Sequence, residues 1–533
     1  MAGRLFKATG IQGTLIGLIL GLTGGQSAIA GALHVQITPQ GIDEAGAKIM
    51  TQLALSQSKL QRRLYGSRTH LLSSQFQDDG SYLLRIYDYS HDTLLWVTGH
   101  PVPGQVIHVQ NIEETFDEPL PSEDEFADAK VILSQDPVLG PQLKLGQMTP
   151  YHAMPGILDE RFDQSKKTER VIAVGLRPEN PALKHEIVGI NLSHPAVIHY
   201  PKGSPPHTIA TKEYCGVRDA GQPDTARGTP GSAELVVKKG DEVLWRMLVT
   251  RPAASSGFWG SGIDLKNVSY KGNLVLSHIN VPILNVNYND NVCGPYRDWQ
   301  YSESAFQADG DNIASGIRSS VTAPQTILES QTDSGNFHGV AVYTEGTETI
   351  LVSEMSAGWY RYVSSFRFDE DGTIRPRFGF AGVSNSCTCN PHHHHAYWRM
   401  NFDIGTADHN SVDSFDGHQW NTVRTEARHY RDQSHTKWRV YNTETQHGYV
   451  IEPGDNSEPA NSFAKGDAWI LRYHDNEMDD SQDYSGLAAN IGDFVNGESV
   501  ENSDVVFWYS EHFFHDHMSD SGSHIVGPTL RPF

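Results

Sequence analysis

A long series of short alternating segments constrains this chain more than any other feature. From residue 230 to Phe533, segments in which apolar and polar residues alternate are separated by turn residues, and no long helical pattern interrupts them. Clear examples are Ala233–Val237, Glu242–Leu248 and Tyr360–Phe368. A period of two places the apolar side chains on one face of a β-strand. We therefore predict a mainly β fold in which residues 230–533 form a large antiparallel β-sandwich.

Two stretches before the sandwich combine helical and strand patterns. In residues 31–112 a helical pattern over Ile42–Leu60 precedes several short strand patterns, and in residues 113–220 the helical pattern Glu123–Leu133 does the same. A linker rich in Pro, Glu and Asp separates them. The sequence predicts two small α+β domains in a row, with one larger domain as the alternative.

The first thirty residues have the pattern of a secretory signal peptide. Arg4 and Lys7 precede the apolar stretch Ile11–Leu22, and Ala28–Ala30 forms an A-x-A cleavage site. The apolar stretch is too short for a membrane span. We predict cleavage near Gly31 and a secreted or periplasmic protein without a membrane span.

Charge and cysteine content narrow the expected partners. The formal net charge of -23 disfavours a nucleic-acid phosphate backbone and favours cationic ligands. In an oxidising compartment the four cysteines can form disulfides. The pairing stays open at this point: Cys215 with Cys293 is one hypothesis, and Cys387 with Cys389 form a bridge or remain free thiols.

Four consecutive histidines, His392–His395, give the strongest chemical signal. In a strand, residues two apart share a face, so His392 and His394 can bind one metal ion while His393 and His395 face the other way. Neutral imidazoles suit copper or zinc. The alternative interpretation is a solvated loop.

A second histidine cluster, His512–His517, follows the strand pattern Val505–Tyr509 near the end of the chain. One of its histidines would complete a three-histidine site with open positions for water or dioxygen. Surface histidines near a chain end are the alternative.

The surrounding motifs occur in a familiar order. His392-x-His394 is followed by Arg399, then by Asp403-Ile404-Gly405 and Asn410-Ser411-Val412, and later by Trp469–His474 and the ending Thr529–Phe533. This order resembles the catalytic domain of copper amine oxidases, the topaquinone-containing primary-amine oxidases, with this chain as a divergent member. In the family the third copper histidine lies seven residues after a strand tryptophan, which here is Trp508 and points to His515. The resemblance thus implies copper bound by His392, His394 and His515.

The resemblance also implies a cofactor made from the chain itself. In the family, copper and dioxygen convert a tyrosine into topaquinone, and the register with Asp371–Ile374 makes Tyr360 the precursor. This sequence departs from the family at both neighbours, because Trp359 replaces an asparagine and Arg361 replaces an acid. An ordinary strand tyrosine is the alternative.

Two further catalytic roles follow from the resemblance. Val286–Asp290 resembles the family motif whose tyrosine hydrogen-bonds the quinone, which selects Tyr288. The family's general base is an aspartate in a Phe-Asp-x-Gly context. Strict register places Gln307 there, which cannot accept a proton, so Asp309 is the candidate base.

A peripheral calcium-type site is also implied. Its matching residues are Asn401, Asp403 and Asp504, whose oxygens are suitable calcium ligands. Asn401 removes one charge from the family pattern, and exposed turn acids are the alternative.

The resemblance implies a homodimeric enzyme that uses dioxygen to convert a primary amine into an aldehyde, ammonia and hydrogen peroxide. The substitutions at Trp359, Arg361 and Gln307 motivate the alternative of a non-catalytic copper-binding relative that lost the quinone machinery. A copper site that works without a quinone is a third interpretation.

Overall fold

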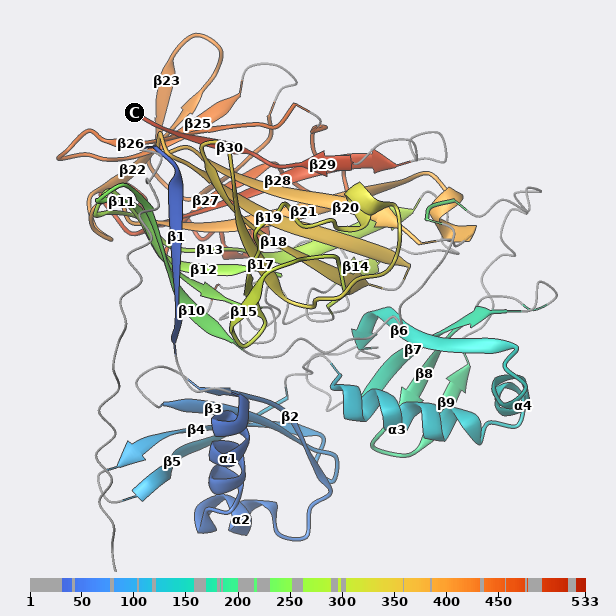
Figure 1. The fold of residues 1–533 in the computed structure, drawn as a ribbon. Helices are drawn as coiled ribbons and strands as arrows, with labels where there is room; N and C mark the ends of the chain where they lie inside the picture. Colours follow the sequence, from blue (N-terminus) through green and yellow to red (C-terminus); the bar gives the residue numbers. More distant parts are fainter. Residues whose placement is uncertain are drawn as a thin grey trace, which may run out of the picture.

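The computed structural model is mainly β, as predicted, and its chain forms one large sandwich and two small α+β units (Figure 1). The structure describes residues 31–40, 44–76, 81–102, 105–116, 121–157, 169–179, 183, 186–199, 215–217, 231–251, 262–288, 296–298, 303–357, 359–383, 386–431, 436–455, 457–474, 477, 491–515 and 524–533. The predicted signal peptide lies outside these residues. Among the described helices, none is long and apolar enough to cross a membrane.

The first face of the sandwich is a ten-stranded sheet in the order β1-β10-β11-β12-β13-β21-β28-β27-β24, with β14 paired to β13. Its strands are β1 (Leu33–Gln40), β10 (Ser232–Lys239), β11 (Glu242–Thr250), β12 (Asp264–Tyr270), β13 (Asn273–Tyr288), β14 (Tyr296–Asp298), β21 (His392–Phe402), β24 (Ala427–His429), β27 (Ala468–Arg472) and β28 (Val505–His515).

The second face is a twelve-stranded sheet in the order β15-β16-β17-β18-β19-β20-β30-β26-β25-β22-β23, with β29 paired to β20. Its strands are β15 (Asp311–Ala314), β16 (Ile317–Ser319), β17 (Val340–Glu345), β18 (Glu348–Ala357), β19 (Tyr360–Asp369), β20 (Ile374–Gly382), β22 (Asn410–Phe415), β23 (Trp420–Val423), β25 (Lys437–Asn442), β26 (Gly448–Glu452), β29 (His524–Val526) and β30 (Thr529–Pro532). The short helix α5 (Ile327–Ser330) and the 3-10 turns η2 (Ser386–Cys389) and η3 (Ile491–Phe494) lie between strands.

Because apolar and polar residues alternate along the strands, the apolar side chains of both sheets meet in a core between them. Trp245 and Trp398 of the first sheet share one buried cluster with Phe366, Phe378 and Trp438 of the second. Such large side chains dominate core energetics, since each buries 150–250 Å² by a typical value. The functional side chains described below are therefore held by a packed interior.

The two small units each place helices on a four-stranded sheet. The first contains α1 (Glu44–Leu55), α2 (Ser58–Leu64), β2 (Thr69–Phe76), β3 (Tyr82–Asp88), β4 (Thr93–Val102) and β5 (Gln105–Thr115). The second contains α3 (Glu123–Ser134), α4 (Leu139–Lys144), β6 (Met148–Ile157), β7 (Val171–Pro178), β8 (Glu186–Asn191) and β9 (Ala196–His199). The helix α3 begins with a complete capping box at Ser122 and Glu125.

The first described strand belongs to the sandwich. β1 falls in the range predicted for the first small domain, but it pairs with β10 from Leu33 to Gln40. Leu33, Val35 and Ile37 pack on the sandwich core while the residues between them are exposed. By pairing with β10, β1 satisfies the backbone groups along the outer edge of β10 and becomes the edge strand of the sheet.

The disulfide differs from the sequence hypotheses. Cys215 is bonded to Cys389, so pairing of Cys215 with Cys293 is wrong, and Cys389 is not bridged to Cys387. The partners are 174 residues apart in the chain. Only the tertiary fold brings such distant cysteines together, which is why local spacing gave no signal for this pair.

Candidate metal centre

Strand pairing brings the two histidine clusters together. β21 and β28 are antiparallel neighbours, and their register places His392 opposite His515 and His394 opposite Phe513. Since opposed residues share a face, His392, His394 and His515 all point toward the interior of the sandwich. All three are buried.

The three histidines form a group with metal-binding geometry. One ligand nitrogen from each lies within 4.8 Å of the others, and His515 Nδ1 is 3.2 Å from His392 Nε2. Among the described residues, this is the one group of three or more His, Cys, Asp or Glu side chains close enough to bind a common ion. The predicted copper ligands are thus assembled at one point.

The hydrogen bonds leave one nitrogen of each of two imidazoles available to a metal. His392 Nδ1 donates to the backbone carbonyl of Asn390, which leaves Nε2 facing the group. His394 Nδ1 lies 3.5 Å from the Tyr362 hydroxyl, and its buried Nε2 has no partner. A buried nitrogen without a partner fits a metal ligand, because an unsatisfied polar atom is otherwise costly.

Burial keeps these imidazoles neutral. It lowers the pKa of His392 to about 3, with a further contribution from nearby His515, and it holds the pKa of His394 well below its usual range. Neutral imidazole is the form that ligates copper or zinc. The donor set therefore fits copper or zinc, the two metals that the histidine pattern predicts.

Tyr360 lies directly against the three histidines. It begins β19 on the facing sheet, and its hydroxyl oxygen is 2.6 Å from His392 Nε2 and 2.9 Å from His515 Nδ1. Its ring meets the edge of the His394 ring at a centroid distance of 4.5 Å. The predicted precursor tyrosine and the predicted metal ligands are brought into contact.

An aromatic group covers the side of the centre near Tyr288. The Tyr288 ring stacks on His392 at a centroid distance of 4.4 Å, and its hydroxyl accepts a hydrogen bond of 2.8 Å from the indole N–H of Trp359. Tyr151 of β6 contacts the edge of the same indole. The Trp359 indole therefore fills the space between Tyr288 and Tyr151 beside the centre.

The Arg361 side chain points away from the histidines and hydrogen-bonds the backbone carbonyl of Tyr360. It forms a fully buried two-bond ion pair with Asp333, at 2.8 and 3.0 Å, and also donates to the Tyr360 carbonyl.

Sequence analysis missed two residues of this site, Tyr362 and Asp333. Tyr362 could have been found from its place two residues after Tyr360, whereas Asp333 carries no local signal.

The structure does not bring Asp309 to the centre. Its exposed carboxylate accepts hydrogen bonds from the hydroxyl groups of Ser320 and Thr322 and from the Val321 amide in a surface turn. These bonds lower its pKa to about 2, which makes it a poor proton acceptor. The side chain of Gln307, which cannot accept a proton, is also exposed.

The three calcium-type residues do lie together. Asn401 lies near the end of β21, Asp403 directly follows that strand, and Asp504 immediately precedes β28, which pairs with it. Each has a buried side-chain oxygen without a hydrogen-bond partner. Burial, and then Asp403, raises the pKa of Asp504 to about 7. Calcium binding stays a prediction, which a calcium titration of thermal unfolding would test.

The alternate histidines face the other side of the sheet. His395 Nδ1 lies 2.8 Å from His512 Nδ1, and both rings are buried. His393 is half-buried, with Nε2 3.8 Å from a Glu458 oxygen. These contacts are made by His393 and His395, the two histidines of the run that do not face the metal centre.

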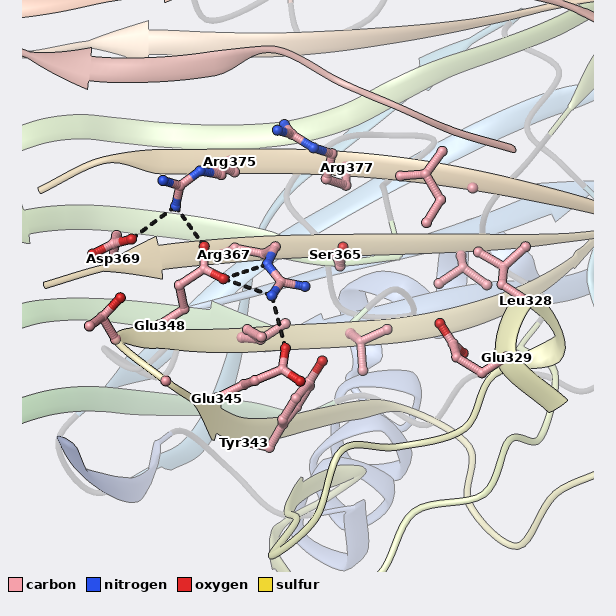
Figure 2. Close-up of a pocket in the computed structure, with 17 residues that line it drawn as sticks. Leu328, Glu329, Tyr343, Glu345, Glu348, Ser365, Arg367, Asp369, Arg375 and Arg377 are labelled. Carbon is pink, nitrogen blue, oxygen red and sulfur yellow. Dashed lines mark hydrogen bonds and ion pairs between the residues drawn. The ribbon is translucent and has the colours of Figure 1, made fainter. Parts of the chain in front are cut away.

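Two cavities differ in their relation to the centre. One of about 90 Å³ adjoins it and is lined by His515, Phe513 and His524, a space for a few water-sized molecules. Another of about 550 Å³ lies on the face of β19 turned away from Tyr360, where Arg367 and Arg375 pair with Glu348 (Figure 2).

Comparison with solved structures supports the fold. A copper-containing benzylamine oxidase from Hansenula polymorpha matches with a TM-score of 0.57 and 13% identity, over 93% of this chain and 97% of the other. An Aspergillus nidulans amine oxidase matches with 0.54 and 13%, over 93% and 90%. A Pichia pastoris lysyl oxidase matches with 0.55 and 12%, over 91% and 89%. No family model and no curated protein sequence matches this chain. Such low identities show a shared fold alone.

Proposed function

We propose that this chain is a copper-dependent oxidoreductase that uses dioxygen and water to convert a primary amine into an aldehyde, ammonia and hydrogen peroxide. One observation carries the proposal: the Tyr360 hydroxyl lies within 3 Å of ring nitrogens from two of three histidines that converge on one point. Copper bound there would supply the activation of dioxygen needed to oxidise Tyr360 to topaquinone.

The chain's own residues have separable roles in this proposal. His392, His394 and His515 would hold the metal, and the buried interior excludes bulk water from it. Arg361 fixes the backbone at Tyr360 by donating to its carbonyl. The names of the three similar structures, all amine or lysyl oxidases, support a primary amine as the substrate class.

A second candidate function is copper binding without amine turnover. It is favoured by the position of Asp309 in a surface turn and by the contact of Trp359 with Tyr288. Amine oxidation needs a base to take a proton from the carbon next to the nitrogen. A protein without that base would still bind copper through the same three histidines.

One experiment separates the two candidates. Copper-loaded, aerated protein is treated with phenylhydrazine, and the visible spectrum is recorded before and after. The proposed enzyme gives a quinone band that shifts to an intense hydrazone band, absent in Tyr360→Phe and retained in the control Tyr343→Phe on β17. Stoichiometric copper without any hydrazone band would reject the enzyme and favour the copper-binding alternative.

A further inference from the structure

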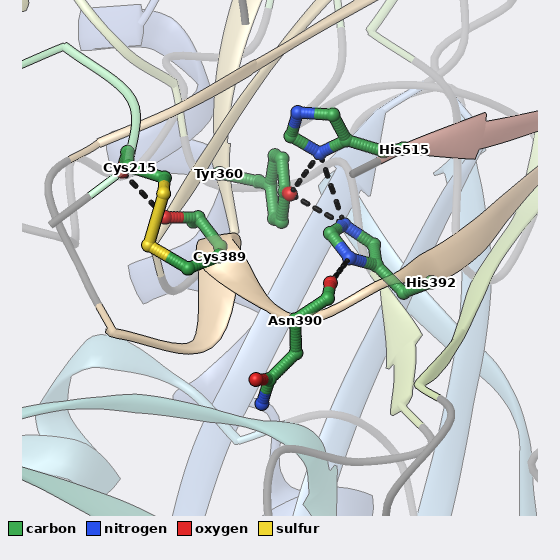
Figure 3. Close-up of a disulfide and its surroundings, with 7 residues drawn as sticks. Cys215, Tyr360, Cys389, Asn390, His392 and His515 are labelled. Atoms are coloured by element: carbon green, nitrogen blue, oxygen red, sulfur yellow. Dashed lines mark hydrogen bonds between the residues drawn. A yellow bond between two sulfur atoms is a disulfide. The ribbon is translucent and has the colours of Figure 1, made fainter. Parts of the chain in front are cut away.

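A disulfide lies next to the candidate metal centre (Figure 3). Cys389 ends the 3-10 turn η2, three residues before His392. Cys215 belongs to the segment that connects the second small unit to β10. The bond therefore fastens an interdomain connector to the chain that enters the metal-ligand strand.

One backbone carbonyl group connects the disulfide to the candidate metal ligand His392. Asn390 directly follows the bonded Cys389, and its backbone carbonyl accepts the hydrogen bond from His392 Nδ1. Cys389 and Asn390 are both buried, and the buried Thr388 hydroxyl donates to the Cys215 carbonyl. The position of the acceptor is thus set by the turn that the disulfide closes.

On the other side of the disulfide, the residues after Cys215 contact β20, the strand that pairs with β19 at Tyr360. The Val217 amide donates to the Gly382 carbonyl at 2.8 Å, and Gly382 is the register partner of Tyr360. Gly216, with a φ of +99°, lies so close that a Cβ there would be 2.4 Å from the Gly382 carbonyl oxygen. A side chain at residue 216 would therefore force the connector away from β20.

We propose that Cys215–Cys389 is a positioning device for the metal centre. By fixing the Asn390 carbonyl, it keeps the proton of His392 on Nδ1 and aims the Nε2 lone pair at the metal. A partner that orients a ligating imidazole in this way typically affects metal affinity by about 10–100-fold. The inference rests on the proposed copper site and adds a role for residues outside the ligand set.

The test compares copper affinity in the wild type and in the double variant Cys215→Ser/Cys389→Ser by competition with a chelator of known affinity. We expect copper binding about 10–100-fold weaker in the variant. The matched control Cys387→Ser changes a neighbouring cysteine outside this bridge and should retain wild-type affinity. Circular dichroism and thermal unfolding establish that each variant is folded.

A spectroscopic readout keeps the proposal testable if the double variant does not fold. In copper-loaded wild type, pulsed electron paramagnetic resonance should detect two coordinated imidazoles whose remote N–H groups exchange slowly with deuterium, as expected for the buried Nδ1 atoms of His392 and His394. Rapid exchange at every remote N–H, or unchanged affinity in a folded double variant, would overturn the positioning role. Failure of the wild type to bind copper would instead reject the proposed function on which it rests.

Discussion

Neighbouring histidines on β21 have opposite environments although they are chemically identical. His394 faces the sandwich interior beside His392 and His515, whereas His395 faces the other way and contacts His512. The pleat alone causes this difference, since successive side chains of a strand point to opposite faces. A residue's role here follows from its parity in the strand.

This parity gives a matched pair of substitutions. We expect His394→Ala to weaken copper binding by more than the ~10–100-fold typical of changes outside the ligand set, because it removes a ligand. His395→Ala, equally buried and one residue away, should leave copper affinity near the wild-type value. Isothermal titration with copper checks both, and equal losses in the two variants would contradict the assignment of faces.

Glu354 is a buried acid whose charge the fold opposes. It lies on β18 and accepts a hydrogen bond from the Ile327 amide through one oxygen, while the other oxygen has no partner. Burial raises its pKa from 4.5 to about 8. Between these values the folded state keeps a proton that the unfolded state has lost, so the free energy of unfolding falls as pH rises.

A pH series of urea unfolding tests this effect. At about 1.4 kcal/mol per pKa unit, Glu354 alone should lower the free energy of unfolding of the wild type by a few kcal/mol between pH 4.5 and pH 8. Glu354→Gln removes the titrating group, so its stability should fall less over the same range. Parallel pH profiles for both proteins would show that Glu354 does not carry this dependence.

At the scale of elements, the ladder between β21 and β28 builds two histidine pairs at once. His392 opposes His515 and His395 opposes His512, and the odd spacing of three residues places the pairs on opposite faces. A slip of one residue would exchange the faces of the whole run. The disulfide and the Asn390 carbonyl act next to the first residue of this strand, where the register begins.

The edge strand β1 allows a second matched comparison. Ile37 packs on the sandwich core, whereas its neighbour Thr38 is exposed. Ile37→Asp should lower the free energy of unfolding by about 1.5–3 kcal/mol, the scale of losing one apolar side chain from a core. Thr38→Lys, which places a cation opposite Glu234 of β10, should change it by less than about 0.5 kcal/mol, as is usual for surface substitutions. Denaturant unfolding measures both, and equal effects would argue against the observed register of β1.

For the whole molecule, export and dimerisation remain predictions from the sequence. The protein recovered from the secreted or periplasmic fraction should begin near Gly31, as measured by N-terminal sequencing. Light scattering should give a mass about twice that of the mature chain. An intact Met1 would reject signal cleavage, and a monomer mass would reject the dimer.

The sequence by itself determined the fold class and the side-chain faces, because both depend on local periodicity. Alternation over residues 230–533 predicted the β-sandwich, and the His-x-His spacing placed His392 and His394 on one face of a strand. Both predictions follow from the two-residue period of a strand. The third ligand, His515, came from the resemblance to copper amine oxidases.

Only the tertiary structure decided which distant segments meet. It joined Cys215 to Cys389, placed β1 beside β10, put the Trp359 indole against Tyr288 and left Asp309 in a surface turn. Each of these outcomes depends on the packing of two sheets and the path of a connector, for which no local period exists. Contacts between residues far apart in the chain arise from the whole arrangement of burial and strand pairing, so short-range patterns cannot specify them.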